Sequence, residues 1–318
     1  MTTVLLGQEW VSQVTKSDSQ DIPVMGASLS PMPSTADFNG LLDVISRSET
    51  AREMSRRKWI RSRSDSIKGK VKERGIALFE FLTVNRSTMP SYAMYKGRRS
   101  SAQRDLLDEV ATMAWIAHVT DVAKEQSSNV AFESSRINND FVYRLARLSA
   151  LEDGPRQALE TVRDIGIRVV IESGLPGMSV DGASFYTKQV GPVLAMTLRY
   201  DRLDNFWFTL LHEIGHIALH LNEASDDVFI DSEEEESDEL EPEAEANAFA
   251  KDSLIPRDTW LRSDARRLGN ERSVLSLAKQ LSIHPAIIAG RIRFERREFR
   301  IFPNLIGIGE VHCSIFRD

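Results

Sequence analysis

Two histidines four positions apart, His212 and His216, lie inside an apolar stretch and limit what this part of the chain can form. Residues four apart on an α-helix share one face, with Cβ atoms about 5–6 Å apart, so both imidazoles can reach one metal ion. Glu213 sits one position round the helix, beside that ion. A carboxylate there can take a proton from a metal-bound water, whose pKa the metal lowers to about 7. The pattern predicts a helix that supports metal-assisted hydrolysis.

The residues around this motif predict that the helix is buried. Apolar residues around the metal would exclude water, and electrostatic interactions are stronger where water is excluded. Gly215 is costly inside a helix unless another segment approaches closely, so we expect a close-packed neighbour there. We expect His220, one turn further on, to support the site or to pack rather than to bind the metal. The apolar residues are Phe206, Trp207, Phe208, Leu210, Leu211, Ile214, Ile217, Ala218, Leu219 and Leu221.

A catalytic zinc site of this kind needs three protein ligands and one open position for water, so a third ligand is required. Residues 241–256, with a proline near each end, predict a second helix. Its small and apolar residues form a face that can pack on the first helix, and Glu245 lies on that face, one turn before Phe249. Glu245 is therefore the predicted third ligand. Glu243 and Glu241 are the alternatives, although an acidic helix start favoured by the helix dipole also explains these two.

Further motifs lie at Val180–Ala183, Pro192–His216, Val228–Asp231 and Glu243–Ala250, the last followed by Leu-Ile-Pro. Together they resemble the ImmA/IrrE metallopeptidases (the DUF955 domain), including the peptidase-like region of long HigA-type antitoxin regulators. The resemblance implies an α+β fold with a zincin-like core, made of a small mixed sheet and active-site helices. A mainly helical N-terminal region and C-terminal helices would flank this core.

The same resemblance implies the roles of the site residues and the activity. The metal ligands would be His212, His216 and Glu245, holding one Zn²⁺ ion per chain, and Glu213 would be the general base. The implied function is a zinc-dependent endopeptidase that cleaves or inactivates a helix-turn-helix repressor or antitoxin in stress, mobile-element or phage-defence regulation. The alternative is an antitoxin-like regulator that binds a partner or DNA with little or no turnover.

Two segments before the histidine motif predict strands, residues 165–171 and 192–200. If the second strand borders the cleft, it can bind an extended peptide by adding it to the sheet edge. Side chains near these strands are candidates to bind substrate or to steady the oxyanion, although a structural role is the more frequent one for such residues. The candidates are Tyr186, Arg199, Tyr200 and Arg202.

The chain is predicted to have four parts. Residues 1–37 lack periodicity and are expected to form a flexible arm. Residues 38–158 are expected to be helical, and residues 159–258 alternate strand and helix signals as the metallopeptidase domain does. Residues 259–318 are expected to form a C-terminal helical region, similar to a helix-turn-helix, with a tail.

Charge is segregated along the chain, although the net charge is only −7. Residues 52–74 hold ten basic residues against three acidic ones, and residues 291–300 add five arginines. Such stretches can contact phosphate backbones. Residues 226–245, between the two predicted metal helices, are strongly acidic and are expected to be a solvated loop. A sharper hypothesis is that this loop covers the cleft or steers a basic partner to it.

Residues 273–293 resemble a helix-turn-helix, with a turn near Ser282 and a second helix that ends in arginines. The resemblance to the peptidase family instead implies a packing unit, which is the interpretation we favour, so direct nucleic-acid binding is the lesser expectation. Residues 1–60 lack a full helix-turn-helix pattern. This favours an enzyme that acts on a separate regulator.

Cysteine content and hydropathy indicate a compartment. The chain has one cysteine, Cys313, which excludes an intrachain disulfide framework and cysteine-rich zinc modules. It has no run of about 18 apolar residues and no basic-then-apolar N-terminus. The sequence therefore predicts a cytoplasmic protein without a membrane partner.

Overall fold

The computed structural model describes residues 45–61, 67–85, 102–126, 130–222, 228–232 and 241–317. The arm predicted for residues 1–37 lies outside these residues, and so do residues 226–227 and 233–240 of the acidic stretch. No helix in the described part of the chain is long and apolar enough to cross a membrane. Internal contacts divide the chain into two units, each considered by itself below.

The first unit is helical. It holds α3 (Glu49–Arg56), α4 (Ile67–Asn85) and the part of α5 (Ala102–Glu125) that precedes residue 118. Ser48 caps α3, because its side chain accepts a hydrogen bond from Ala51 N at 3.1 Å. The core of this unit includes the fully buried side chains of Ala51, Met54, Leu78 and Trp115.

Among the described residues, the second unit contains residues 118–174 and 178 onwards, so it includes the last part of α5. The predicted division of the chain into four parts stays a prediction. Two helices that the sequence assigned to the N-terminal region, α6 (Asn139–Arg147) and α7 (Gly154–Arg163), belong to this unit. The physical reason is that their apolar faces join its hydrophobic core. These faces carry Phe141, Leu145, Leu159 and Val162.

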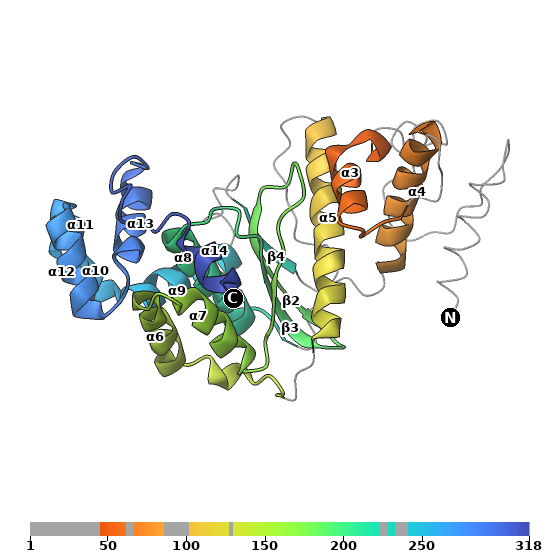
Figure 1. The fold of residues 1–318 in the computed structure, drawn as a ribbon. Helices are drawn as coiled ribbons and strands as arrows, with labels where there is room; N and C mark the ends of the chain where they lie inside the picture. Colours follow the sequence, from red (N-terminus) through yellow and green to blue (C-terminus); the bar gives the residue numbers. More distant parts are fainter. Residues whose placement is uncertain are drawn as a thin grey trace. The chain divides into compact units, whose positions relative to one another are not determined.

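The second unit is built around a four-stranded mixed sheet (Figure 1). Its strands are β1 (Arg168–Ile171), β2 (Val180–Thr187), β3 (Gly191–Met196) and β4 (Val228–Ser232), in the order β1-β3-β2-β4. β1 and β3 are parallel, whereas β2 pairs antiparallel with both β3 and β4. This sheet, with the helices around it, confirms the predicted α+β fold class.

The strand order corrects one expectation about the substrate. The second predicted strand is β3, which is hydrogen-bonded to β1 on one side and to β2 on the other. Its main-chain groups are therefore already paired, and it cannot add a peptide to the sheet. In the described part of the sheet, the outer strands are β1 and β4.

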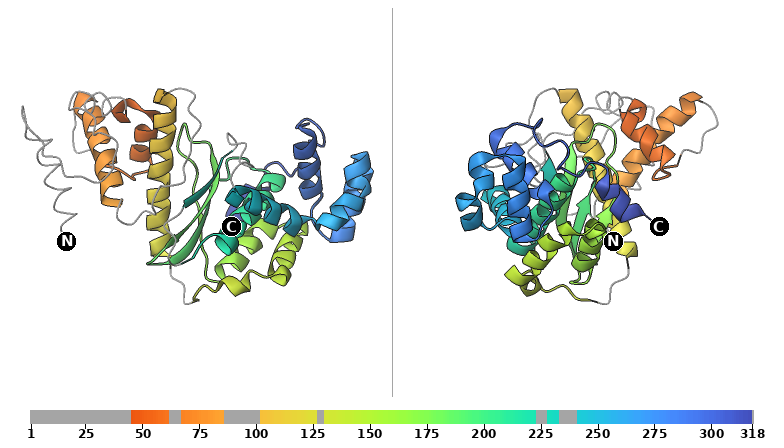
Figure 2. Two further views of the ribbon diagram at one scale, coloured as in Figure 1. Left: turned by 180° about the vertical axis from the view of Figure 1, so that it is seen from behind. Right: turned by 60° about the vertical axis from the view of Figure 1, so that its left-hand side comes forward.

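One face of the sheet packs against α8 (Leu203–Leu219), the helix that carries the histidine motif. Figures 1 and 2 show α6, α7, α8 and α9 (Glu241–Leu254) on the same side of the sheet. Leu194 and Met196 of β3 and Phe229 of β4 belong to the same core as the apolar residues of α8. Burying each large apolar side chain contributes about 1.5–3 kcal/mol, so this packing fixes α8 on the sheet.

The C-terminal helices continue from α9. They are α10 (Arg257–Arg262), α11 (Asp264–Leu268), α12 (Glu271–Leu281), α13 (Pro285–Arg296) and α14 (Glu310–Phe316). The N-cap residue of α12 is Asn270, which forms a reciprocal capping box with Ser273. The N-cap residue of α13 is His284, whose ring accepts a hydrogen bond from Ala286 N.

The pair α12–α13 corresponds to the segment that resembles a helix-turn-helix. DNA-binding units of that type present the N-terminal residues of the second helix to the major groove. Here α13 packs against α8 instead, and its buried residues include Ala286, Ile287, Ile288, Ala289 and Ile292. At Gly290, a Cβ would lie only 2.6 Å from Asp204 Cβ, so α13 comes very close to the start of α8. This packing is what the resemblance to the peptidase family implies for the segment, and direct nucleic-acid binding stays the lesser expectation.

Candidate metal centre

The histidine motif lies in the middle of α8, on a turn that is closed off from solvent. His212 and His216 are 1% exposed and Glu213 is fully buried. Burying a polar group costs free energy unless the group is paired or binds an ion, so three buried polar groups on one turn indicate a binding site. Most of the apolar residues predicted to bury this helix are themselves buried and account for the burial of the site, whereas Leu219 is 52% exposed.

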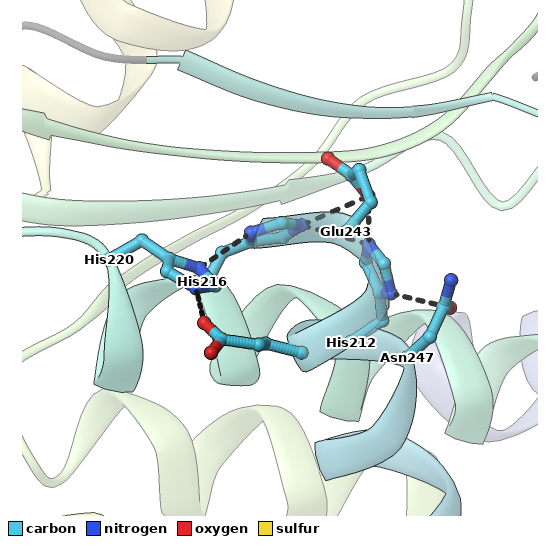
Figure 3. Close-up of polar contacts among 6 residues, drawn as sticks. His212, His216, His220, Glu243 and Asn247 are labelled. Carbon is cyan, nitrogen blue, oxygen red and sulfur yellow. Dashed lines mark hydrogen bonds and ion pairs between the residues drawn. The ribbon is translucent and has the colours of Figure 1, made fainter. Parts of the chain in front are cut away.

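The third member of the site is Glu243, from the first turn of α9. His212 Nε2 and His216 Nε2 lie 3.3 and 3.4 Å from Glu243 Oε2, and 3.0 Å from each other (Figure 3). Four ligands about 2.0–2.1 Å from a tetrahedral zinc ion are about 3.3–3.4 Å apart. The two histidine–glutamate distances match the edge of a zinc tetrahedron, and the 3.0 Å between the two imidazole nitrogens is slightly shorter, so two imidazoles and a carboxylate fit a zinc ion here.

The protonation states suit a cation. Burial lowers the pKa of His216 to about 4, so its imidazole is neutral at neutral pH and can offer a lone pair. Burial raises the pKa of Glu243, but hydrogen bonds to His212 and His216 outweigh that effect and hold this pKa at about 2. The site thus offers a cation the negative charge of Glu243 and the neutral imidazole of His216.

Glu213 points from α8 towards β2, where Gly182 makes room for it. A Cβ built on Gly182 would lie 2.5 Å from Glu213 Oε1 and 2.8 Å from Thr209 Cγ2. Any larger residue at this position must therefore displace the carboxylate. Because Gly182 has no side chain, the carboxylate of Glu213, the candidate general base, can lie against β2. The sequence analysis did not predict this role for Gly182.

The position of Glu245 corrects the predicted ligand set. Its Oε2 lies 2.9 Å from His220 Nε2, and its side chain is 55% exposed, whereas Glu243 is buried against the two histidines. The helical period explains the difference. Glu243 shares a face with Ala246 and Ala250, which are fully buried, while Glu245 lies two positions further round the helix. Glu241, the other alternative, is exposed.

Each metal-facing imidazole is held from its second ring nitrogen. His212 Nδ1 lies 3.2 Å from Asn247 Oδ1, and His216 Nδ1 lies 3.1 Å from His220 Nδ1 (Figure 3). Such outer contacts orient metal-binding histidines and fix their tautomers. Asn247 was missed from the sequence, but its signal was present, because it follows Glu243 by four positions and so shares its helix face.

The close neighbour expected at Gly215 is α9. A Cβ on Gly215 would lie 3.1 Å from Phe249 Cδ1 and 3.3 Å from the Cα of Ala246. The missing side chain lets the two helices approach until Glu243 reaches both histidines. The expectation of a close-packed neighbour at this position is confirmed.

The four residues predicted to bind substrate or steady the oxyanion have other described contacts. Arg202 Nε binds Asp204 Oδ1 at 2.9 Å, and Arg199 donates a hydrogen bond to the carbonyl of Ser179 at 3.3 Å. Both guanidinium groups also lie 5.1 Å from the ring of Tyr200. Tyr186 lies on β2, opposite Pro192 of β3. Arg202 is the N-cap residue of α8, ten residues and about 15 Å of helix before His212, and its side chain makes no capping hydrogen bond. A substrate role for these four residues stays a prediction.

Comparison with known proteins agrees with this geometry. Residues 162–293 match the family model described as the IrrE N-terminal-like domain, Peptidase_M78. The matched region includes the whole sheet, α8, α9 and every residue of the His-His-Glu cluster. No curated protein matches the chain.

Proposed function

We propose that this chain, whose residues 162–293 form a metallopeptidase domain of the ImmA/IrrE family, is a zinc-dependent endopeptidase. The observation that carries the proposal is the convergence of His212, His216 and Glu243 at a spacing close to tetrahedral, with the buried Glu213 on the same turn of α8 as the two histidines. Two imidazoles and one carboxylate leave a fourth position for water, as catalytic zinc sites require.

When bound, zinc would supply Lewis acidity that activates a water and polarises the scissile carbonyl. Glu213 would accept a proton from the water as the water oxygen bonds to the carbonyl carbon. Glu213 would then return that proton to the leaving nitrogen as the carbon–nitrogen bond breaks. Gly182 and Thr209, which enclose the Glu213 carboxylate, would keep it within reach of both partners.

The proposed substrate is a helix-turn-helix repressor or antitoxin, cleaved or inactivated in stress, mobile-element or phage-defence regulation. The motifs shared with ImmA/IrrE metallopeptidases and HigA-type regulators support this substrate class. The acidic stretch 226–245, which joins the two metal helices in the sequence, carries a charge that would attract a basic DNA-binding partner. A chain with one cysteine suits the cytoplasm, where such a partner works.

The second candidate is a regulator that binds a partner or DNA with little turnover, and the basic stretches favour it. Two arginines of the stretch 291–300 face the protein, however. Arg291 binds Glu295 at 3.0 Å and donates to the carbonyls at the end of α9, and Arg293 is only 6% exposed. A pure binder also has no need of a buried general base, so we favour the enzyme.

The test compares new protein N-termini, by mass spectrometry, in cells that express the wild-type chain or Glu213→Gln. A pull-down on the variant accompanies it. We expect a repressor fragment only with the wild type, and the intact repressor bound to the variant. Asp252→Asn, which removes an exposed carboxylate from α9, is the matched control and should cleave as the wild type does. Identical N-termini in all samples, with a partner or DNA bound equally, would establish the second candidate instead.

A further inference from the structure

We propose that His220 and Glu245 form a hydrogen-bonded relay that fixes the tautomer and orientation of His216 and so strengthens its hold on the metal. The inference rests on the proposed zinc site and adds two positioning residues to it. Neither residue offers an atom to the His-His-Glu cluster, so both would act through His216.

The direction of the hydrogen bonds follows from the ring atoms that face one another. His216 turns its Nε2 towards His212 and Glu243, which leaves Nδ1 for the proton if Nε2 binds the metal. That Nδ1 lies 3.1 Å from His220 Nδ1, and only one of these two nitrogens can donate. His216 must therefore donate and His220 must accept.

The same reasoning fixes the proton of His220. A neutral imidazole that accepts at Nδ1 carries its proton on Nε2. His220 Nε2 lies 2.9 Å from Glu245 Oε2, which accepts that hydrogen bond. Every donor in the series His216–His220–Glu245 thus has an acceptor, and the series ends on a carboxylate.

The surroundings hold both rings in place. The ring of Phe229 stacks on His216 with centroids 4.2 Å apart and an angle of 13°, and it also lies 5.3 Å from the ring of His220. The backbone N–H of His220 donates to the carbonyl of His216 at 2.9 Å, at the end of α8. The side chains become more exposed along the series, from 1% for His216 to 11% for His220 and 55% for Glu245.

The relay makes the two metal histidines unequal. His212 donates to a neutral amide, Asn247, whereas His216 is linked through a second imidazole to a charged carboxylate. A carboxylate at the end of such a series increases the electron density on the metal-binding nitrogen. We expect His216 to depend more on its outer partners than His212 does.

The test measures the zinc dissociation constant of the full chain by competition with a chromophoric chelator. His220→Leu removes the acceptor and should weaken zinc binding about 10–100-fold. His220→Asn, whose side-chain oxygen can take the place of Nδ1, should recover most of that loss. Glu245→Ala, at an exposed position that leaves the core intact, should weaken binding several-fold, and the control Asp252→Asn should leave it unchanged.

A second readout reports the tautomers directly. In nitrogen-15 NMR spectra of the zinc-loaded chain, His216 should be protonated on Nδ1 and His220 on Nε2. Zinc affinity equal to the wild type in both His220→Leu and Glu245→Ala, or a proton on Nδ1 of His220, would overturn the relay. These results would not contradict the proposed peptidase function. That function is contradicted only if cleavage continues without zinc or without Glu213.

Discussion

Gly182 on β2 faces Glu213 on α8 so closely that a Cβ at position 182 would lie 2.5 Å from Glu213 Oε1. Gly182→Ala should therefore move Glu213, the proposed general base, without touching a proposed metal ligand. Because a misplacement of about 1 Å can cost 10²-fold in rate, we expect kcat for peptide cleavage to fall by about that factor while the zinc content stays at one ion.

The control for this change is Gly174→Ala. A Cβ at Gly174 would lie 3.6 Å or more from its neighbours, an ordinary contact, so kcat should be unchanged. Equal rates for the two variants would show that Gly182 does not set the position of Glu213.

The ligand set can be tested by removing one carboxylate at a time. Glu243→Gln should lose zinc on dialysis, because Glu243 Oε2 is the third corner of the site, 3.3 and 3.4 Å from the two imidazoles. Glu245→Gln should retain one ion per chain, since its amide oxygen can still accept from His220. Elemental analysis of the dialysed proteins gives the answer, and loss of zinc from Glu245→Gln alone would reverse the assignment.

Gly215→Ala should separate α8 from α9. The added methyl group would lie 3.3 Å from the Cα of Ala246, which can move only with the helix, and 3.1 Å from Phe249. Overpacking costs about 1–3 kcal/mol, and the gain in helix propensity returns at most about 1 kcal/mol. We expect a lower free energy of unfolding in denaturant and weaker zinc binding. A variant as stable as the wild type, with unchanged zinc affinity, would contradict this account.

His284 should make stability depend on pH. Burial lowers its pKa below the ordinary value, and attraction to Glu310 opposes this only in part. Its Nδ1 accepts a hydrogen bond from Ala286 N at 3.1 Å, which requires an unprotonated nitrogen. The unfolded chain takes up a proton near pH 6.5 and the folded chain only at lower pH. The contribution to stability is therefore complete above about pH 6.5 and is lost as the pH falls through the folded pKa.

His284→Asn keeps a good N-cap that does not titrate in this range. Urea unfolding at pH 7.5 and 5.5 should show a smaller loss of stability for the variant than for the wild type. The same loss in both proteins would mean that other groups cause the pH dependence.

The sequence predicted the elements of the site better than their arrangement. The helix around His212 and the second helix from residue 241 are both present, as α8 and α9, and the resemblance to ImmA/IrrE metallopeptidases is confirmed for residues 162–293. The two helices and the family motifs depend on the spacing of nearby residues and on the pattern of apolar side chains, and both can be read from the sequence.

The structure places Glu243, the alternative, and not the predicted Glu245 beside the two histidines, for a reason that sequence cannot remedy. Glu243 and Glu245 each lie on a face of α9 with small or apolar residues, Ala246 and Ala250 for one and Phe249 for the other. Which face meets α8 depends on how α9 rotates about its axis when the helices pack. The same limit applies to β3, whose interior position follows from strand order and not from its own residues.

The site draws its three ligand atoms from two helices that are far apart in the sequence, His212 and His216 on α8 and Glu243 on α9. An ion held by both helices would act as a cross-link between two distant points of the chain, in the way a disulfide does in proteins of oxidising compartments. Zinc supply would then govern more than the chemistry. A cell short of the metal would hold a chain in which α9 is less firmly docked and more open to proteases, so metal scarcity would shorten the lifetime of the protein as well as stop the proposed cleavage.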